Sequence, residues 1–172
     1  LHHNQLTSID VSGLTGLQHL ELHSNLLTSI DVSGLTGLKN LNLHHNQLTS
    51  IDVSGLTGLQ RLELHDNLLN TSVPLHFSNL TNLECLNLRN NQLKGTLSWI
   101  NRLTKLKRLD LRNNTFSGEF PSIDQLKDLE YLGIGGSGFQ YNQSFIQTML
   151  PQLIFYGDHF RTSDFEGYWC VE

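Results

Sequence analysis

The sequence predicts an α/β-type repeat solenoid: a curved, right-handed horseshoe segment with a parallel β-sheet on its concave face. Its convex side should be mostly loops, 3₁₀ turns and short strands. Three observations support this fold. Asparagines recur at a nearly fixed interval, leucines recur around each of them, and the stretch LHHNQLTSIDVSGLTGLQ occurs twice, at residues 1–18 and 43–60. A fixed period of roughly 20–30 residues is typical of units that stack one on the next.

Each unit carries an asparagine at the same place in its frame. The first four asparagines are 21 residues apart, and the later spacings are 24, 23, 23 and 21 residues. The surrounding leucines fit L-x-x-L-x-L-x-x-N-x-L, and the last copies of the frame are degraded. The repeated position is occupied by Asn4, Asn25, Asn46, Asn67, Asn91, Asn114, Ser137 and Asp158.

This frame resembles the leucine-rich repeat family, and the match covers nearly the whole chain. Residues 1–69 are similar to the 21-residue repeats of bacterial surface proteins, and residues 91–126 are similar to plant-type repeats of 23 or 24 residues. There, NQLKGTL and NTFSGEFP follow an N-x-L-x-G-x-[LIF]-P-like pattern, although Leu97-Ser98 lacks the proline. The resemblance implies a non-catalytic module that recognises a protein, peptide or glycan, outside the cell or at its surface.

The strand of each unit is expected just before the asparagine. Residues 19–23 should form a short strand with Leu20 and Leu22 pointing inward, and successive strands should stack about 4.8 Å apart. A coil cannot bury its leucines alone, so stability comes from its neighbours. We expect the asparagine amide to bridge backbone groups of adjacent coils, because a buried amide needs hydrogen-bond partners.

The convex half of each unit is expected to fill the core from the other side. Ile9, Val11, Leu14 and their copies should pack there. Gly13, Gly34 and Gly55 should lie in tight turns, because glycine tolerates the φ values that such turns need.

We divide the chain into a repeat array at residues 1–139 and a C-terminal part at 140–172. The second part is expected to be a degraded last repeat followed by a cap or a bridge to a neighbouring domain, with a short helix at 142–150. The chain begins inside a coil without an N-terminal cap. Because solenoids cover their terminal coils, we expect a fragment of a longer array.

Composition excludes several classes of function. The formal charge of −5 includes no basic stripe for nucleic acid, and no apolar run approaches the roughly 20 residues of a membrane span. Two cysteines, Cys85 and Cys170, are too few for a disulfide scaffold, and their separation gives no reason to expect that they pair.

Two sequence patterns look like known functional motifs, but the repeat frame explains both of them. GIGGSG at 133–138 matches a dinucleotide fingerprint, yet the frame places Ile134 inward and Ser137 in the asparagine position, so we expect a strand with a bare outer face. The column Asp10, Asp31 and Asp52 offers one carboxylate per coil, which is sparse for calcium and favours a solvated acidic stripe. We therefore predict no enzyme, no cofactor and no metal site.

The concave face is where a partner should bind. Side chains alternate along a strand, so the outward positions can be derived from the frame, and they are polar, charged and aromatic. The alternative is a structural spacer within a large surface assembly or adhesin, with an idle concave face. The candidate partner-binding residues are His19, Glu21, His23, Asn40, Asn42, His44, His45, Arg61, Glu63, His65, Asp66, Asn87, Arg89, Arg108, Asp110, Arg112, Tyr131 and Tyr156.

Histidines are concentrated on this predicted face. Seven of the nine lie within residues 1–65, and one column of them should have neighbours about 5 Å apart. Duplication of an exposed histidine is the simplest account. A pH-sensitive face is the second, because protonating all seven would change the charge of residues 1–69 from −4 (six acidic against two basic residues) to +3. Incidental zinc or nickel binding is the third, although a flat ladder offers no fixed fourth ligand.

Overall fold

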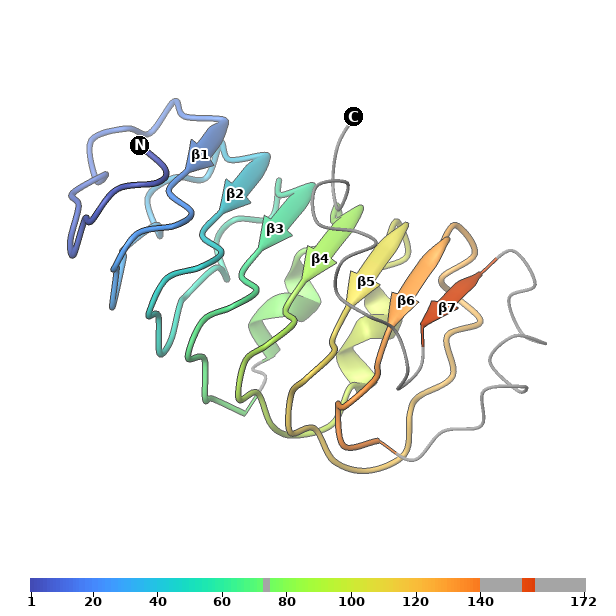
Figure 1. The fold of residues 1–172 in the computed structure, drawn as a ribbon. Helices are drawn as coiled ribbons and strands as arrows, with labels where there is room; N and C mark the ends of the chain where they lie inside the picture. Colours follow the sequence, from blue (N-terminus) through green and yellow to red (C-terminus); the bar gives the residue numbers. More distant parts are fainter. Residues whose placement is uncertain (73–74, 140–152, 157–172) are drawn as a thin grey trace.

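The computed structural model describes residues 1–72, 75–139 and 153–156 of the 172-residue chain. These residues form one parallel sheet of seven three-residue strands, paired in chain order along one face of a solenoid (Figure 1). The predicted fold class is confirmed. The strands are β1 (His19–Glu21), β2 (Asn40–Asn42), β3 (Arg61–Glu63), β4 (Cys85–Asn87), β5 (Arg108–Asp110), β6 (Tyr131–Gly133) and β7 (Ile154–Tyr156).

The convex side carries two short 3₁₀ helices, η1 (Leu75–Asn79) and η2 (Ser98–Arg102). They lie behind β4 and β5 (Figure 1), in the longer units, whereas the 21-residue units have only turns there. The part of the chain that the structure describes contains no helix long and apolar enough to cross a membrane.

Each strand is shorter than predicted. β1 ends at Glu21 instead of residue 23, because the backbone turns sharply at Ser24, whose φ is 55°. The same left-handed conformation recurs in other coils, where it ends the extended segment. The non-glycine residues with this conformation have φ between 51° and 55° and are His3, Ser24, His45, Asp66, Asn90 and Asn113.

The core is a column of inward side chains from both halves of each coil. Leu20 and Leu22 are buried as predicted, and so is Val11 on the convex side. Ile9 and its copies Ile30 and Ile51 are only partly buried and pack against the edge of the core. Leu14 is 50% exposed, against 1% for its copy Leu35. The difference follows from stacking, because the coil that contains Leu14 has a neighbour on one side only.

The asparagine ladder is confirmed. Asn67 accepts the Leu48 N–H at 3.0 Å and donates to the carbonyls of Leu43 and Leu64 at 3.0 and 3.1 Å. Asn25, Asn46, Asn91 and Asn114 repeat this arrangement between their own coils and the preceding ones.

Serine takes over this position in the next unit. The Ser137 hydroxyl contacts the Leu111 carbonyl at 3.0 Å and also the carbonyl of Ile134. The ladder therefore extends through the described repeats with a shorter side chain at its last described position.

The prediction for Gly13, Gly34 and Gly55 is wrong in its mechanism. They lie in turns, but their φ values are outside the left-handed region. An aspartate shapes each of these turns instead: the Asp10 carboxylate accepts the Ser12 N–H at 2.9 Å, and Asp31 and Asp52 do the same in their coils. That hydrogen bond lowers the pKa of Asp10 and of Asp31 and gives the acidic column a structural role.

Several predictions concern residues outside the described ranges. The helix at 142–150 and the cap or bridge lie largely there, so the division at residue 139 stays a prediction. Tyr156 ends β7 opposite Gly133, but its side chain lies outside the description.

Candidate binding face and histidine cluster

The concave face is built from the first and third residues of each strand and from the residues that follow. The register aligns these positions: Glu21 stands beside Asn42, and Asn42 beside Glu63. In β1 both outward residues are exposed, and in β2 and β3 they are half-buried. The structure thus brings the predicted residues of the first three strands together on one accessible surface.

A shallow pocket of about 60 Å³ lies across β1–β3. Burial, with a contribution from Glu21, raises the pKa of Glu63 to about 7. The Glu63 carboxyl group is therefore partly protonated at neutral pH and can both donate and accept hydrogen bonds. The pocket is lined by Glu21, Asn40, Leu41, Asn42, Arg61 and Glu63.

The face is less accessible towards β4–β6. Asn87, Asp110 and Tyr131 are 2%, 0% and 7% exposed, so these three candidates do not offer free surface. Cys85 is buried and disulfide-bonded, a state that we had no reason to expect from the sequence. The only other cysteine of the chain, Cys170, lies outside the described residues.

Asp110 and Arg112 form a buried ion pair at this end. The Arg112 guanidinium donates to the Asp110 carboxylate through Nε at 2.9 Å and Nη2 at 2.5 Å, and the Arg112 backbone N–H donates at 3.0 Å. Burial raises the pKa of Asp110, and the Arg112 charge opposes that shift. This pair is a structural unit of the sheet surface.

Gly133 provides the space that this pair occupies. A Cβ at position 133 would lie 2.7 Å from Asp110 Oδ1 and 3.0 Å from Arg112 Nε. The predicted bare patch is therefore wrong, because side chains of the preceding coil already cover it. The glycine of the dinucleotide-like motif has a packing role in this solenoid.

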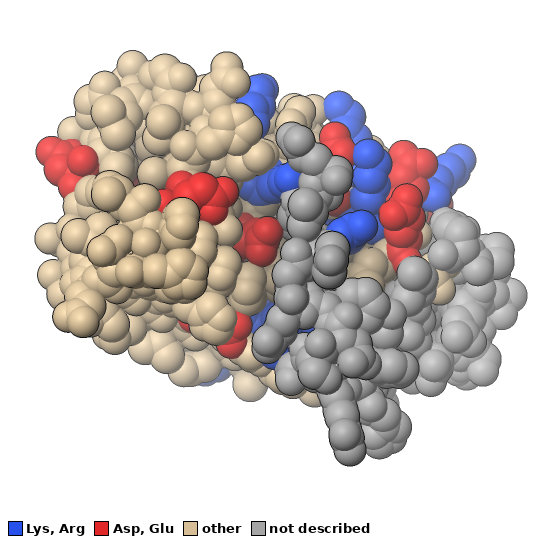
Figure 2. Space-filling view, turned by 45° about the horizontal axis from the view of Figure 1, so that its top comes forward, with Lys and Arg blue, Asp and Glu red and all other residues tan. Residues whose placement is uncertain are grey.

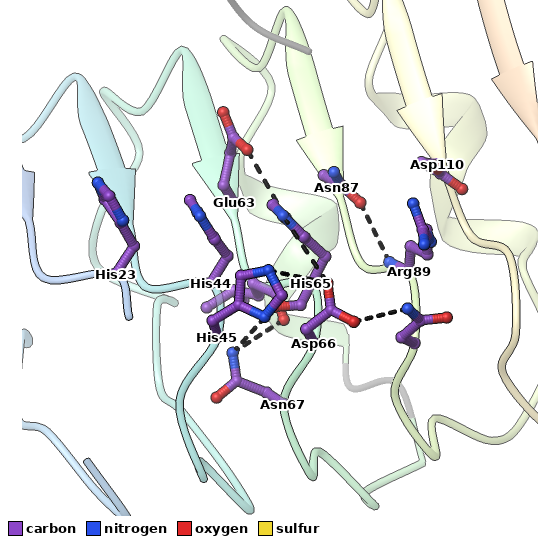
Figure 3. A network of polar contacts seen from close by, with 12 residues as sticks. His23, His44, His45, Glu63, His65, Asp66, Asn67, Asn87, Arg89 and Asp110 are labelled. Carbon is purple, nitrogen blue, oxygen red and sulfur yellow. Dashed lines mark hydrogen bonds and ion pairs between the residues drawn. The ribbon is translucent and has the colours of Figure 1, made fainter. Parts of the chain in front are cut away.

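The histidine column forms a stack of rings. His2, His23, His44 and His65 have consecutive ring centroids 4.6, 4.5 and 4.3 Å apart and nearly parallel planes, which confirms the predicted spacing. His45 approaches from the side, with its ring 5.1 Å from that of His44 and 5.7 Å from that of His65. Figure 3 shows His45 and His65 beside Asp66, with His44 and then His23 further along the row.

Stacking and burial change the chemistry of the inner rings. Burial lowers the pKa of His44 and of His65 to about 3, with further contributions from neighbouring imidazoles. Both rings stay neutral at mildly acidic pH, so the predicted face on which all seven histidines gain charge together does not follow from this geometry.

We expect these two rings to make the fold less stable in acid. In the unfolded chain both titrate near 6.5, whereas in the folded chain they titrate near 3. Between these values the unfolded state binds more protons, so the free energy of unfolding falls as pH drops below 6.5. After a discount for solvent screening, the loss from pH 7.5 to pH 5 should be about 1–2 kcal/mol.

Urea denaturation at both pH values measures this loss, and His44→Asn/His65→Asn is the matched variant. Between pH 7.5 and pH 5 the free energy of unfolding should fall by about 1–2 kcal/mol less in the variant than in the original chain. Glu63, whose pKa is raised to about 7, contributes with the opposite sign over this range in both chains. A histidine-resolved NMR titration in which His44 and His65 protonate near pH 6.5 would contradict the prediction.

Comparison with known proteins gives the class of the fold. A family profile described as "Leucine rich repeat" matches residues 36–93, and one described as "Leucine Rich repeats (2 copies)" matches residues 81–125. No curated protein sequence matches the chain significantly. Among solved structures, a leucine-rich repeat protein of Leptospira interrogans is 34% identical with a TM-score of 0.77, over 89% of this chain and 41% of that one.

Ectodomains of plant receptor kinases are also similar to this chain. The ectodomain of the Arabidopsis thaliana receptor kinase GASSHO1/SCHENGEN3 is 34% identical with a TM-score of 0.75, over 82% of this chain and 18% of that one. The ectodomain of the Arabidopsis receptor kinase SOBIR1 is 30% identical with a TM-score of 0.62, over 70% of each chain. The chain belongs to the leucine-rich repeat family, and it spans about two fifths of the Leptospira protein and a fifth of the GASSHO1/SCHENGEN3 ectodomain.

Proposed function

We propose that this repeat segment is a non-catalytic recognition module that binds a protein or peptide partner through its concave face, outside the cell or at its surface. The segment of the face that binds comprises β1–β3 and Arg89, which follows β4. It is accessible, polar and held on a rigid sheet, whereas the outward side chains of β4 and β6 are buried in the fold itself.

Two cations on this segment carry the proposal. Arg61 and Arg89 are half-buried on the concave side, and neither guanidinium forms an ion pair within the part of the chain that the structure describes. The charges of Arg61 and Arg89 act on Glu63 and Asp110 from a distance, but a half-buried arginine that makes no close ion pair is well placed to bind a carboxylate from a partner. We therefore infer a partner that presents acidic side chains or a terminal carboxylate.

Charge is distributed unevenly over the molecule. Figure 2 shows few charged residues over the N-terminal coils and interleaved basic and acidic residues towards the C-terminal coils.

Solved relatives support the peptide class: the GASSHO1/SCHENGEN3 ectodomain is in complex with CASPARIAN STRIP INTEGRITY FACTOR 2, and RGFR1 is a plant peptide hormone receptor in complex with RGF2.

The experiment is a selection of random linear peptides displayed on phage against the purified chain. We expect enrichment of acidic peptides and a loss of their binding by at least tenfold in Arg61→Ser/Arg89→Ser, because each desolvated charge pair contributes a few kcal/mol. The matched control, Lys94→Ser/Arg102→Ser, removes the same charge from exposed positions off the concave strands and should retain binding.

A structural spacer would behave differently. In that case the selection would yield no sequence preference, or its peptides would bind both double variants equally well. Either result would refute recognition through this face.

A further inference from the structure

A compact group of four metal-ligating side chains lies where β2 and β3 end. His44 and His45 follow β2, and His65 and Asp66 follow β3, so two adjacent coils supply two ligands each (Figure 3). One nitrogen from each of the three histidines can be chosen so that all lie within 4.8 Å of one another. Asp66 Oδ2 lies 3.7 Å from His45 Nε2 and 4.0 Å from His65 Nε2.

The left-handed backbone makes this convergence possible. In a regular strand, His44 and His45 would point to opposite faces. His45 instead has a φ of 51°, and Asp66 has 54°. This turn brings each of these side chains to the same side as the histidine that precedes it, so Asp66 lies near two of the three histidines and can serve as a fourth ligand.

A neighbouring side chain orients one of the histidine ligands. His44 Nδ1 lies 2.6 Å from Asn42 Oδ1; because that oxygen can only accept, Nδ1 carries the proton and Nε2 keeps its lone pair. The Glu63 carboxyl group lies 3.6 Å from Nδ1 of His65, which is beyond hydrogen-bond distance, so Nδ1 of His65 has no hydrogen-bond partner among the described residues. A partner such as Asn42 behind a histidine is typical of metal sites, since it fixes the ring and raises its basicity.

Asp66 is held in the same way. Its Oδ1 accepts a hydrogen bond from Asn90 Nδ2 at 2.6 Å, and Asn90 Oδ1 in turn accepts one from Asn113 Nδ2 at 2.7 Å. This chain of amides leaves Oδ2 directed at the imidazoles. The carboxylate is thus anchored from behind, as expected of a ligand that must hold its position without a bound ion.

We propose that His44, His45, His65 and Asp66 bind one divalent transition-metal ion of the zinc class. Three imidazole nitrogens and one carboxylate oxygen are a ligand set that zinc accepts, at about 2.0–2.2 Å in a tetrahedron. Such a tetrahedron needs ligand atoms roughly 3.3 Å apart, so the present distances must shorten by up to about 1.5 Å. His45 can supply part of that movement, because its side chain is 58% exposed. The rings of His44 and His65, which are nearly parallel with centroids 4.3 Å apart, must also tilt so that their nitrogens point at one ion.

Packing holds two of the ligands close together. The rings of His44 and His65 are stacked with their centroids 4.3 Å apart, and the His65 side chain is only 15% exposed. The metal site would use part of the concave face. Its existence does not depend on the peptide partner proposed above, and the two proposals are tested by separate experiments.

The duplication provides an internal control. His2, His3 and His23 repeat the three histidines one two-coil unit earlier, with ring centroids 4.6–5.3 Å apart. The position of Asp66 is occupied there by Ser24. Three clustered imidazoles are thus present in both groups, whereas the carboxylate is present in only one.

The experiment is isothermal titration of zinc chloride into the full, untagged chain after treatment with EDTA. We expect one site with a Kd on the order of micromolar, and a loss of at least about tenfold in His45→Asn and in Asp66→Asn. Asparagine fits both backbones, because Asn90 and Asn113 have the same left-handed conformation in later coils. The control His3→Asn should change the Kd by less than about twofold, and thermal melts of the metal-free variants verify folding.

Each possible result either supports or overturns the proposal of a metal site. A single site that His45→Asn and Asp66→Asn weaken and His3→Asn does not would support the proposal. No measurable zinc binding, an unchanged affinity in Asp66→Asn, or several sites that His3→Asn and His45→Asn weaken alike would overturn it.

Discussion

Replacing Asn67 by alanine is expected to lower the free energy of unfolding by about 3–5 kcal/mol. The amide of Asn67 satisfies one backbone N–H, of Leu48, and two carbonyls, of Leu43 and Leu64, between two coils. The site is 6% exposed, so water cannot replace these hydrogen bonds. Each backbone group left without a partner costs about 1–3 kcal/mol.

Asn4→Ala is the matched control for this substitution. Asn4 has the same place in its repeat, but it is exposed, and its amide donates only to the Leu1 and His2 carbonyls. Its loss should cost less than about 1 kcal/mol, because water can hydrate the freed groups. Urea denaturation followed by circular dichroism measures both variants, and equal losses would show that the ladder does not join the coils.

The repeat made this ladder predictable before any coordinates. A fixed period decides which residues become neighbours in a solenoid, so Asn46 and Asn67 had to stack whatever the surrounding sequence. The same logic correctly placed Leu20, Leu22 and the histidine column. It failed for Leu14 only because stacking requires a neighbour on both sides.

Backbone conformation within a coil was not predictable from the leucine frame. The frame directed attention to Gly13, although the pattern Asp10-Val-Ser12 already contained an aspartate that can accept an N–H two residues on. The left-handed residue after each strand left no signal in the frame, because histidine, serine, aspartate and asparagine all occupy it. That conformation is what converts a column of histidines into a cluster with His45 and Asp66.

The sequence predicted which surface forms the candidate site, but it did not predict the contacts among the side chains on that surface. The alternation along strands gave the correct outward residues in β1–β3, where the side chains stay accessible. It could not indicate that Asp110 and Arg112 fold over the next coil, because the direction of a long side chain depends on the space beside it. The glycine at position 133 was the signal, and we interpreted it as bare surface.

Gly133→Ala is expected to lower the free energy of unfolding by about 3 kcal/mol, at the low end for breaking a buried ion pair. The added methyl group would lie 2.7 Å from Asp110 Oδ1 and 3.0 Å from Arg112 Nε, distances at which one side chain must move. Asp110 is fully buried, so moving either partner leaves a charge without its counterion. Gly16→Ala is the control, because within the described residues a Cβ at position 16 meets nothing within 4 Å, and its effect should stay within about 0.5 kcal/mol.

A double-mutant cycle with Asp110→Ala distinguishes this cause from a general disturbance of the sheet. If the methyl group acts through the ion pair, Gly133→Ala should cost much less in a chain that already lacks the Asp110 carboxylate, and the two losses should fall short of additive by at least about 1 kcal/mol. Strict additivity, or a Gly133→Ala variant as stable as Gly16→Ala, would mean that Arg112 and Asp110 adjust at little cost. Non-additivity would show that glycine at this position serves the packing of the preceding coil, which is the reason that a motif shaped like a nucleotide fingerprint occurs in a repeat solenoid.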